Sequence, residues 1–262
     1  MVITSKDNET IKHIRKLKEK KYRDEFNEYI IEGIKLIKEA INEKAEIKTI
    51  IVCDNCDKNE TIEQNMMYEI AKYNCVYVDE KIFSHITEVQ NPQGILAVIG
   101  KGNKEEKIDY SQDMIVILDD IQDPGNLGTI LRTVDSAGLK QIIVSKKSGD
   151  AYNPKVVRST MGAIFRVNII ESQNLVNTIK DIQKNKFKVL ATALETNDTI
   201  YDIDFSEKVA IVIGNEANGV SKEVLEIADN KVKIPMLGKT ESLNAAVATG
   251  IVIYEYVREK VK

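Results

Sequence analysis

Short, almost purely apolar runs in the second half of the chain restrict its fold more than any other feature. The runs are MIVIL, QIIV, FRVNII, KVLAT, VAIVI and KVKI, at residues 114–118, 141–144, 165–170, 188–192, 209–213 and 231–234. Strands without polar alternation are buried on both faces, as the parallel strands of α/β sheets are. Helical patterns separate most of the runs, at residues 127–137, 154–161, 175–184 and 221–228. The sequence therefore predicts an α/β domain built on a parallel sheet.

The first half of the chain alternates between strand and helix patterns as well. Strands are predicted at 29–31, 47–52, 75–78 and 94–99, and helices at 33–42 and 61–73. The polar, glycine-bearing run GKGNKEEKID at 100–109 has no apolar periodicity, which is typical of a linker. We therefore predict a smaller α/β domain at residues 1–103, followed by the larger one at 104–262.

Composition indicates an ordinary globular protein. The apolar share is 43% and the charged share 30%. The segment richest in apolar residues, 243–257, is shorter than the ~20 residues that a spanning helix needs. The first residues lack the charged-then-apolar layout of a signal peptide. We therefore expect a cytoplasmic protein.

The three cysteines are too few for a disulfide framework. Cys53 and Cys56 have the Cys-x-x-Cys spacing of a redox couple or of half a zinc site. Only Cys75 and His85 could complete such a site, and no second close pair is present. We interpret the cysteines as buried or incidental thiols and predict no bound metal.

A local excess of positive charge lies near the start of a chain whose net charge is −4. In IKHIRKLKEKKYR, residues 11–23, Ile11, Ile14 and Leu17 recur at helical spacing, which predicts one helix with an apolar stripe. Its basic remainder is either a solvated surface or a face that contacts the phosphates of a nucleic acid. The candidate RNA-binding residues are Lys16, Lys18, Lys20, Lys21 and Arg23.

Three polar turns follow apolar strands in the second half, at the places where open α/β sheets bind ligands. They are DPGNLG at 123–128, GNEANG at 214–219 and LGKTES at 237–242. Taken one at a time, each has a structural explanation, because Asn126, Ser242 or Asn244 could cap a helix. Likewise, Glu216 could bond backbone amides, and a glycine at the end of a strand, Gly214, would let a ligand approach the main chain.

Two common types of site are not indicated. No G-x-G-x-x-G follows a strand and no G-x-x-x-x-G-K-[ST] is present, so neither a dinucleotide fingerprint nor a P-loop is predicted. The only two histidines, His13 and His85, precede the larger domain, which argues against a Ser-His-Asp hydrolase there.

Together, the three turns and their flanks resemble a known family. DPGNLGTILRT, VIGNEANGVS and IPMLGKTESLNAAVATGI are similar, in this order, to motifs one, two and three of the SpoU/TrmH RNA ribose 2′-O-methyltransferases of the SPOUT superfamily. YIIEGIKLIKEAI and NPQGILAVI resemble parts of the family's L30e/L7Ae-like substrate-binding domain. The resemblance implies an S-adenosyl-L-methionine cofactor, a trefoil knot in the C-terminal domain, a homodimer and an RNA substrate.

The resemblance also implies roles for individual residues. The cofactor-binding residues would be Thr192, Ala193, Leu194, Gly214, Ile234 and Leu243, and the catalytic ones Arg132, Asn126, Glu216, Ser242 and Asn244. Family members are proposed to use the motif-one arginine as a general base. A guanidinium remains charged, above all beside a phosphate, so positioning the phosphate and the hydroxyl is the physically easier role for Arg132.

The remaining catalytic candidates would shape the loops around the target ribose. The reaction expected from the resemblance is 2′-O-methylation of a structured RNA, and the L30e-like domain favours ribosomal RNA. One alternative is the same reaction on transfer RNA. Another is a non-catalytic RNA-binding factor in ribosome assembly that keeps the fold, although the motif residues are all present.

Overall fold

The computed structural model describes residues 2–54, 64–102 and 107–261. The chain forms two compact units. The N-terminal unit comprises Met1–Asn103 together with Tyr152–Phe165, and the C-terminal unit comprises Lys104–Ala151 and Arg166–Lys262. A segment from the second half of the sequence thus belongs to the N-terminal unit. The single domain boundary predicted after residue 103 assigned this segment to the C-terminal domain. Four residues of the predicted linker, 103–106, lie outside the described residues.

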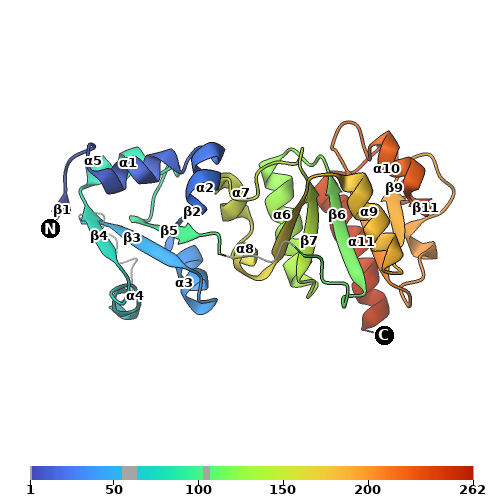
Figure 1. Ribbon diagram of the computed structural model, residues 1–262, viewed down its shortest axis with the longest axis horizontal. Coiled ribbons are helices and arrows are strands. Elements are labelled where there is room, and N and C mark those ends of the chain that lie inside the picture. The colour runs from blue at the N-terminus through green and yellow to red at the C-terminus, as the bar shows by residue number, and fades with distance from the viewer. Residues whose placement is uncertain (1, 55–63, 103–106, 262) are drawn as a thin grey trace. The chain divides into compact units, whose positions relative to one another are not determined.

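The N-terminal unit is built on a mixed sheet of five strands in the order β1-β4-β3-β5-β2 (Figure 1). Strand β5 runs antiparallel to both of its neighbours, whereas β1, β4 and β3 are parallel. The strands are β1 (Val2–Ile3), β2 (Glu28–Glu32), β3 (Ile47–Cys53), β4 (Cys75–Val78) and β5 (Ile95–Gly100). The helices are α1 (Glu9–Lys16), α2 (Lys20–Phe26), α3 (Ile34–Asn42), α4 (Gln64–Ile70) and α5 (Glu80–Ile86).

The predicted single helix at 11–23 is wrong, because the chain forms two helices there. α1 ends at Lys16 and α2 begins at Lys20. Ile11, Ile14 and Leu17 do face the core, so the apolar stripe was identified correctly although the helix beyond it turns away. The buried Arg23 fixes the break, since its Nη1 donates to the carbonyl oxygens of Leu17 and Lys18 at 2.8 and 2.7 Å.

Residues 152–165 supply two short helices, α7 (Pro154–Ser159) and α8 (Ala163–Arg166). The ring of Tyr152 lies 5.0 Å from that of the buried Tyr29 in β2, and Nζ of Lys101 lies 4.8 Å from the Tyr152 ring. Burial raises the pKa of Tyr29 well above its usual value. The chain turns between the two helices at Gly162, where φ is +98° and where a Cβ would lie 2.9 Å from a carboxylate oxygen of Glu39.

The C-terminal unit confirms the predicted parallel sheet. Its six strands lie in the order β11-β9-β10-β6-β7-β8, and every neighbouring pair is parallel. The strands are β6 (Met114–Asp119), β7 (Gln141–Ser145), β8 (Asn168–Ser172), β9 (Lys188–Thr192), β10 (Val209–Gly214) and β11 (Asn230–Val232). The helices are α6 (Pro124–Ser136), α9 (Leu175–Lys184), α10 (Lys222–Ile227) and α11 (Ala245–Lys260), with a 3₁₀ turn, η2, at Ile200–Asp202.

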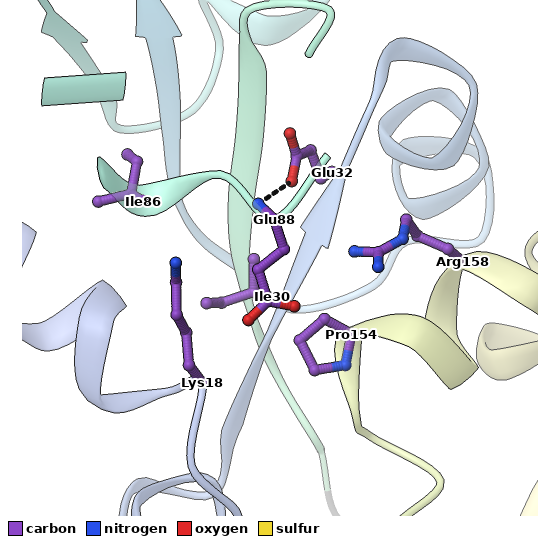
Figure 2. Close-up of a pocket in the computed structure, with 7 residues that line it drawn as sticks. All are labelled: Lys18, Ile30, Glu32, Ile86, Glu88, Pro154 and Arg158. Carbon is purple, nitrogen blue, oxygen red and sulfur yellow. Dashed lines mark hydrogen bonds between the residues drawn. The ribbon is translucent and has the colours of Figure 1, made fainter. Parts of the chain in front are cut away.

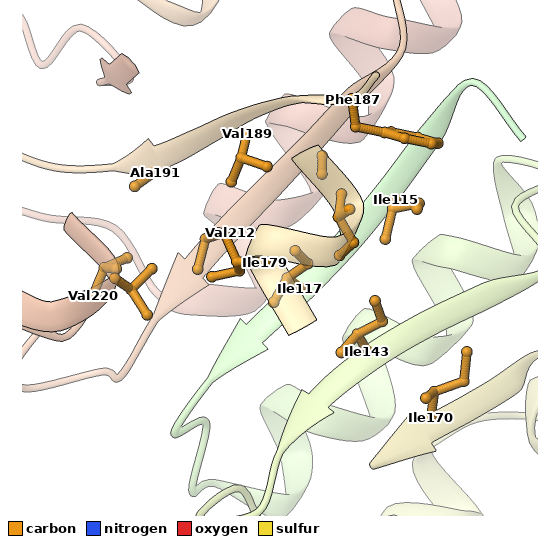
Figure 3. Close-up of a cluster of buried hydrophobic side chains, with 13 residues drawn as sticks. Ile115, Ile117, Ile143, Ile170, Ile179, Phe187, Val189, Ala191, Val212 and Val220 are labelled. Atoms are coloured by element: carbon orange, nitrogen blue, oxygen red, sulfur yellow. The ribbon is translucent and has the colours of Figure 1, made fainter. Parts of the chain in front are cut away.

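The continuous apolar strands are buried as expected. Every residue of β6 and β10 is buried. Alternate residues of the central strands, such as Ile115 and Ile117, pack with Ile179 and Ile182 of α9 into one cluster (Figure 3). α11 packs against α6. The predicted strand at 165–170 is wrong in its first part, because Ala163–Arg166 is helical and β8 begins at Asn168.

No helix in the described parts of the chain combines the length and the apolar character needed to cross a bilayer.

Candidate active site

The candidate cofactor residues lie beyond neighbouring strands of the C-terminal sheet. β9, β10 and β11 are parallel neighbours, and in their register Ala191 stands opposite Val212 and Thr192 opposite Val232. β6 lies on the other side of β10, with Asp119 opposite Gly214. The carboxyl ends of these four strands therefore meet at one edge of the sheet, which is where open α/β sheets bind ligands.

Glu216 is the centre of a hydrogen-bond cluster at this edge. Its carboxylate accepts hydrogen bonds from the backbone amides of Gln122 and Asp123, at 3.3 and 3.2 Å. It also accepts one from the side-chain amide of Asn126, at 2.9 Å. These donors belong to the turn after β6, whereas Glu216 belongs to the turn after β10. One carboxylate thus joins the first and the second polar turn.

Asn126 extends the cluster to the third polar turn. Its Oδ1 accepts a hydrogen bond from Nδ2 of Asn244 at 2.8 Å. Oδ1 of Asn244 in turn accepts from the backbone amides of Ala246 and Val247, which makes Asn244 the N-cap of α11. Because a carboxylate only accepts, Glu216 turns the Asn126 amide so that its oxygen faces Asn244. All three turns are thereby linked by side chains.

The prediction that Asn126 caps a helix is wrong. Asp123 is the N-cap of α6, and its Oδ1 accepts from the backbone amide of Asn126 at 2.8 Å. Asn126 is the third residue of α6, within its first turn, and is 8% exposed. Its side chain is therefore free of a capping role and instead bridges Glu216 and Asn244. The structural explanations given for Glu216 and Asn244 do hold, since the first bonds amides and the second caps a helix.

Hydrogen bonds determine the charge state of Glu216. Partial burial pushes the pKa of this carboxyl upward, but the bonds donated by Asn126, Gln122 and Asp123 outweigh burial and hold the pKa below its usual value of 4.5. Glu216 is thus a carboxylate at neutral pH, and this is the form that can accept all three bonds.

Gly214 is required for a reason other than ligand access. A Cβ at this position would lie 2.1 Å from the backbone carbon of Gly219 and 2.1 Å from the nitrogen of Val220. The loop folds back onto the end of β10 through two backbone bonds between Asn215 and Gly219. The lack of a side chain at Gly214 therefore permits this turn, which presents Glu216.

Two residues that the sequence analysis did not single out also hold the loops. Asn215 donates from Nδ2 to the carbonyl oxygen of Asp120 at 2.7 Å. The buried carboxylate of Asp119 accepts from the backbone amide of Ser221 at 2.8 Å, next to the start of α10. The pair Asp119-Asp120 at the end of a buried strand was the available signal, since an acidic residue there needs donors from a neighbouring loop.

The candidate cofactor residues after β9 and β11 present main chain and apolar side chains. Thr192 donates its hydroxyl to the carbonyl oxygen of Val212 at 3.0 Å, and the amide of Ala193 donates to the carbonyl oxygen of Val232 at 3.0 Å. Leu194 is 65% exposed, while Ile234 and Leu243 are half-buried. Exposed leucine at a sheet edge fits a ligand with an apolar part such as adenine.

Arg132 and Ser242 are not part of the hydrogen-bond cluster of Glu216, Asn126 and Asn244. Both are exposed, and neither forms a hydrogen bond or ion pair with any residue that the structure describes. Arg132 lies on the outer side of α6, whose inner side includes Leu131 and Val134. Its guanidinium is therefore available to a group from outside this chain.

The candidate RNA-binding residues separate into two groups. Lys16, Lys20 and Lys21 are exposed. Lys18 is half-buried, and its ammonium donates to the carbonyl oxygens of His85 and Thr87. The prediction for Arg23 is wrong, because its side chain is 2% exposed and bonds the backbone at the α1–α2 break.

A small pocket lies within the N-terminal unit, apart from the residues predicted to bind cofactor. Figure 2 shows its lining residues, Lys18, Ile30, Glu32, Ile86, Glu88, Pro154 and Arg158. Oε2 of Glu32 accepts from the backbone amide of Glu88 at 3.4 Å, so one of its two carboxylates is tied to the pocket wall.

No group of three or more histidine, cysteine or acidic side chains in the described ranges is arranged to hold a metal ion. Cys53 is disulfide-bonded, so the expectation of a thiol is wrong there, whereas Cys75 is a free, half-buried thiol. Cys56 lies outside the described residues.

Both halves of the chain match families of known proteins. Residues 113–254 match the model of the SpoU rRNA methylase family, and residues 8–97 match the MRM3-like substrate-binding domain. The chain is 35% identical, over 96% of its length and 97% of the relative's, to the 23S rRNA (guanosine(2553)-2′-O)-methyltransferase RlmP of Bacillus subtilis.

Solved structures agree over the whole chain. An rRNA methyltransferase from Sinorhizobium meliloti superposes with a TM-score of 0.86 at 33% identity, covering 99% of this chain and 98% of its own. The AdoMet-bound form of an rRNA methyltransferase from the same organism gives a TM-score of 0.86 at 32% identity over the same shares. These rRNA methyltransferases therefore share the fold of the present chain over almost its full length.

Proposed function

The chain belongs to the SpoU rRNA methylase family, and we propose on this basis that it methylates a ribose 2′-hydroxyl of ribosomal RNA with S-adenosyl-L-methionine as cofactor. One observation carries the proposal to this chain's own residues. A chain of hydrogen bonds runs from Glu216 to Asn126 and from Asn126 to Asn244. It joins the three motifs at the edge of the parallel sheet where the strands have their carboxyl ends.

The cofactor, when bound, supplies an electrophilic methyl group on a sulfonium. The protein must hold a ribose hydroxyl in line with that methyl group, exclude water and help to remove one proton. Alignment can contribute ~7–11 kcal/mol to such a reaction, whereas general acid–base help contributes about 10²–10⁴-fold. Rigid loops are therefore worth more here than a strong base.

We propose that the loops after β9, β10 and β11 bind the cofactor. Thr192, Ala193 and Leu194 would line one side, with Leu194 offering its exposed side chain. Gly214, Ile234 and Leu243 would contribute mainly main chain. Thr192 and Ala193 are hydrogen-bonded to neighbouring strands, which fixes the position of this wall.

Arg132 would position the RNA. A guanidinium binds a phosphate through two parallel hydrogen bonds and stays charged beside it. The exposure of Arg132, and its lack of a partner among the described residues, support this role. Asn126 and Glu216 would shape the first two loops, and Ser242 and Asn244 would hold the third loop near the ribose.

The N-terminal unit would bind the RNA substrate. Its match to an MRM3-like substrate-binding domain and the name of the Bacillus subtilis relative favour ribosomal RNA over transfer RNA. The exposed Lys16, Lys20 and Lys21 would then contact phosphates. The substrate-binding part would lie within residues 1–103 and the methyltransferase part within 104–262.

We further propose a homodimer in the cytoplasm, with the trefoil knot of the family in the C-terminal unit. Val247 and Tyr254 on α11 are both 51% exposed, and exposed apolar residues on a helix favour a covered face. Light scattering of the purified chain tests the dimer. A monomer at all concentrations would refute it.

Two measurements test the enzyme directly. Calorimetry should show that one S-adenosyl-L-methionine binds per chain, and mapping of ribose methylation in cells with and without the gene should reveal one position in ribosomal RNA that depends on it. A dependent position in transfer RNA would favour the first alternative. Tight RNA binding without cofactor binding would favour a non-catalytic assembly factor.

A further inference from the structure

The N-terminal unit carries a cluster of aromatic and basic side chains on α1 and α2, which we call the aromatic–basic ledge. Its members are His13, Lys16, Lys21, Tyr22 and Phe26. The rings of Tyr22 and Phe26 are nearly parallel, with an interplanar angle of 13° and centroids 6.1 Å apart. Nζ of Lys16 lies 5.5 Å from the Tyr22 ring and 6.0 Å from the Phe26 ring. Nζ of Lys21 lies 5.5 Å from the Tyr22 ring.

The ledge is anchored at one end and accessible at the other. Phe26 packs against the core cluster of the N-terminal unit, and the His13 ring lies 4.8 Å from it. His13 is held in turn by Glu28, 2.6 Å from its Nε2. Tyr22 is half-buried, and its hydroxyl forms no hydrogen bond with any of the described residues. Phe26 and His13 thus hold the inner end of the ledge in place. The Tyr22 ring at the outer end is not held by any hydrogen bond of its own to the described part of the chain.

The positive charge of the ledge is not neutralised by neighbouring acids. Lys16, Lys20 and Lys21 form no ion pair with any residue in the described ranges. Two nearby carboxylates already have other partners, since Asp24 pairs with Lys101 at 2.6 Å and Glu28 with His13. Next to Phe26 the surface is hollowed, and Asn27, Glu46, Lys48 and Gly102 complete the lining of this hollow.

We propose that the aromatic–basic ledge binds an unstacked base of single-stranded RNA, with the base stacked on Tyr22 and the lysines at the flanking phosphates. Bases stack on aromatic rings within basic surfaces in many proteins that bind single strands. The lysines that now lie over the ring can move aside, because an exposed cation–π contact is weaker than base stacking and their stems are flexible. This inference rests on the proposed function, which it refines by assigning the unit a single-stranded segment rather than a duplex.

Tyr22→Leu removes the aromatic ring and Tyr22→Phe keeps it, while both leave the lysines of the ledge unchanged. Comparing the two variants therefore isolates the contribution of stacking from that of charge. The probes are a single-stranded RNA of about 12 nucleotides and the corresponding duplex, and the readout is the dissociation constant of the full-length protein. Tyr22→Leu should weaken single-strand binding about 10-fold or more, whereas Tyr22→Phe should bind as the wild type does. Tyr68→Leu is the matched control, because Tyr68 is 74% exposed in α4 of the same unit and no cation among the described residues lies over its ring.

A fluorescence experiment reports the stacking itself. The chain contains no tryptophan, so Tyr22→Trp introduces a single tryptophan at the ledge, which can be excited separately from the tyrosines. Single-stranded RNA should quench its emission strongly, and the duplex should quench it less. Tyr68→Trp should show no quenching with either probe. Equal quenching by both probes, or none at position 22, would overturn the proposal.

The outcomes also distinguish this proposal from the proposed function. If a folded Tyr22→Leu variant binds single-stranded RNA as tightly as the wild type, the ledge is not a base platform, whatever the protein methylates. If single-strand binding depends on Tyr22 but the wild type binds no S-adenosyl-L-methionine, the ledge proposal stands and the methyltransferase assignment fails. Circular dichroism and thermal unfolding of each variant establish that it is folded.

Discussion

The side-chain nitrogen of Asn126 lies 2.9 Å from Oε1 of Glu216, although 90 positions separate the two residues in sequence. This bond fixes which way the Asn126 amide points, and its oxygen consequently accepts from Asn244. The orientation of the third loop therefore depends on a carboxylate in the second. A substitution of Asn126, Glu216 or Asn244 should therefore also change the positions of the other two loops.

Asn126→Asp should destabilise the protein more than Asn126→Ala at neutral pH. The new carboxylate would face Glu216, and two adjacent carboxylates resist ionisation together. Loss of the buried amide alone costs about 1–3 kcal/mol. Chemical denaturation at pH 7.5 and pH 5 measures both variants. The Asn126→Asp defect should shrink at the lower pH, whereas a defect of equal size at both values would contradict like-charge repulsion.

Glu216→Gln should remove a stability that depends on pH. The folded pKa of Glu216 lies below its usual value of 4.5, because hydrogen bonds to the carboxylate outweigh its partial burial. A depressed pKa stabilises the protein above the unfolded value and ceases to do so as pH falls through the folded value. The wild type should therefore exceed the variant in melting temperature at pH 7, and the two should converge below pH 4.5. A difference in melting temperature that persists unchanged well below pH 4.5 would show that the charge is unimportant.

Three glycine-to-alanine variants should differ sharply. Gly214→Ala places a Cβ 2.1 Å from the Gly219 backbone and should unfold the loop and abolish cofactor binding. Gly219→Ala meets no atom within 4 Å but has φ of +67°, so it should cost about 1–2 kcal/mol. Gly238→Ala has neither problem and should leave the melting temperature unchanged. Similar losses in all three would contradict this steric explanation.

Local patterns predicted the sheet and most elements well. α9 was predicted with its observed bounds, Leu175–Lys184, because its apolar stripe is regular and Asn174 caps it. The break between α1 and α2 could not be seen, since it depends on Arg23 bonding the carbonyls of Leu17 and Lys18. A basic residue in a basic run gives no sign that it is buried.

The site was predicted only in part for a similar reason. Motif resemblance singled out Asn126, Glu216 and Asn244 as candidates, but no pattern indicated that they bond one another across three loops. The same holds for Gly214, whose neighbour is the backbone of its own loop. Contacts between segments that are distant in sequence depend on the whole fold, so they cannot be predicted from single residues or short patterns.

Arg132→Lys should impair catalysis without affecting stability. Lysine keeps the charge but not the planar fork that binds a phosphate through two bonds. We expect the single-turnover methylation rate to fall by about 10²-fold or more, with unchanged thermal unfolding because Arg132 is exposed and has no partner among the described residues. Cofactor affinity, measured by calorimetry, is the control. A variant as active as the wild type would refute a bidentate role.

Arg23→Met and Lys20→Met should separate structure from RNA contact. Arg23→Met leaves the carbonyl oxygens of Leu17 and Lys18 without their donor and should lower the melting temperature by several degrees. Lys20→Met alters an exposed residue and should leave melting unchanged while weakening RNA binding and reducing its salt dependence. Titrations at several salt concentrations measure both. If Lys20→Met instead lowered the melting temperature and Arg23→Met weakened only RNA binding, the basic surface would have been located incorrectly.

The ring of Tyr152 against Tyr29, and Lys101 above it, has a consequence for recombination between relatives. A chimaera that exchanges only the first 103 residues would confront a foreign α7–α8 segment with a surface it did not evolve to match. An exchange of the whole N-terminal unit therefore needs three crossovers, one near residue 103 and one on either side of 152–165.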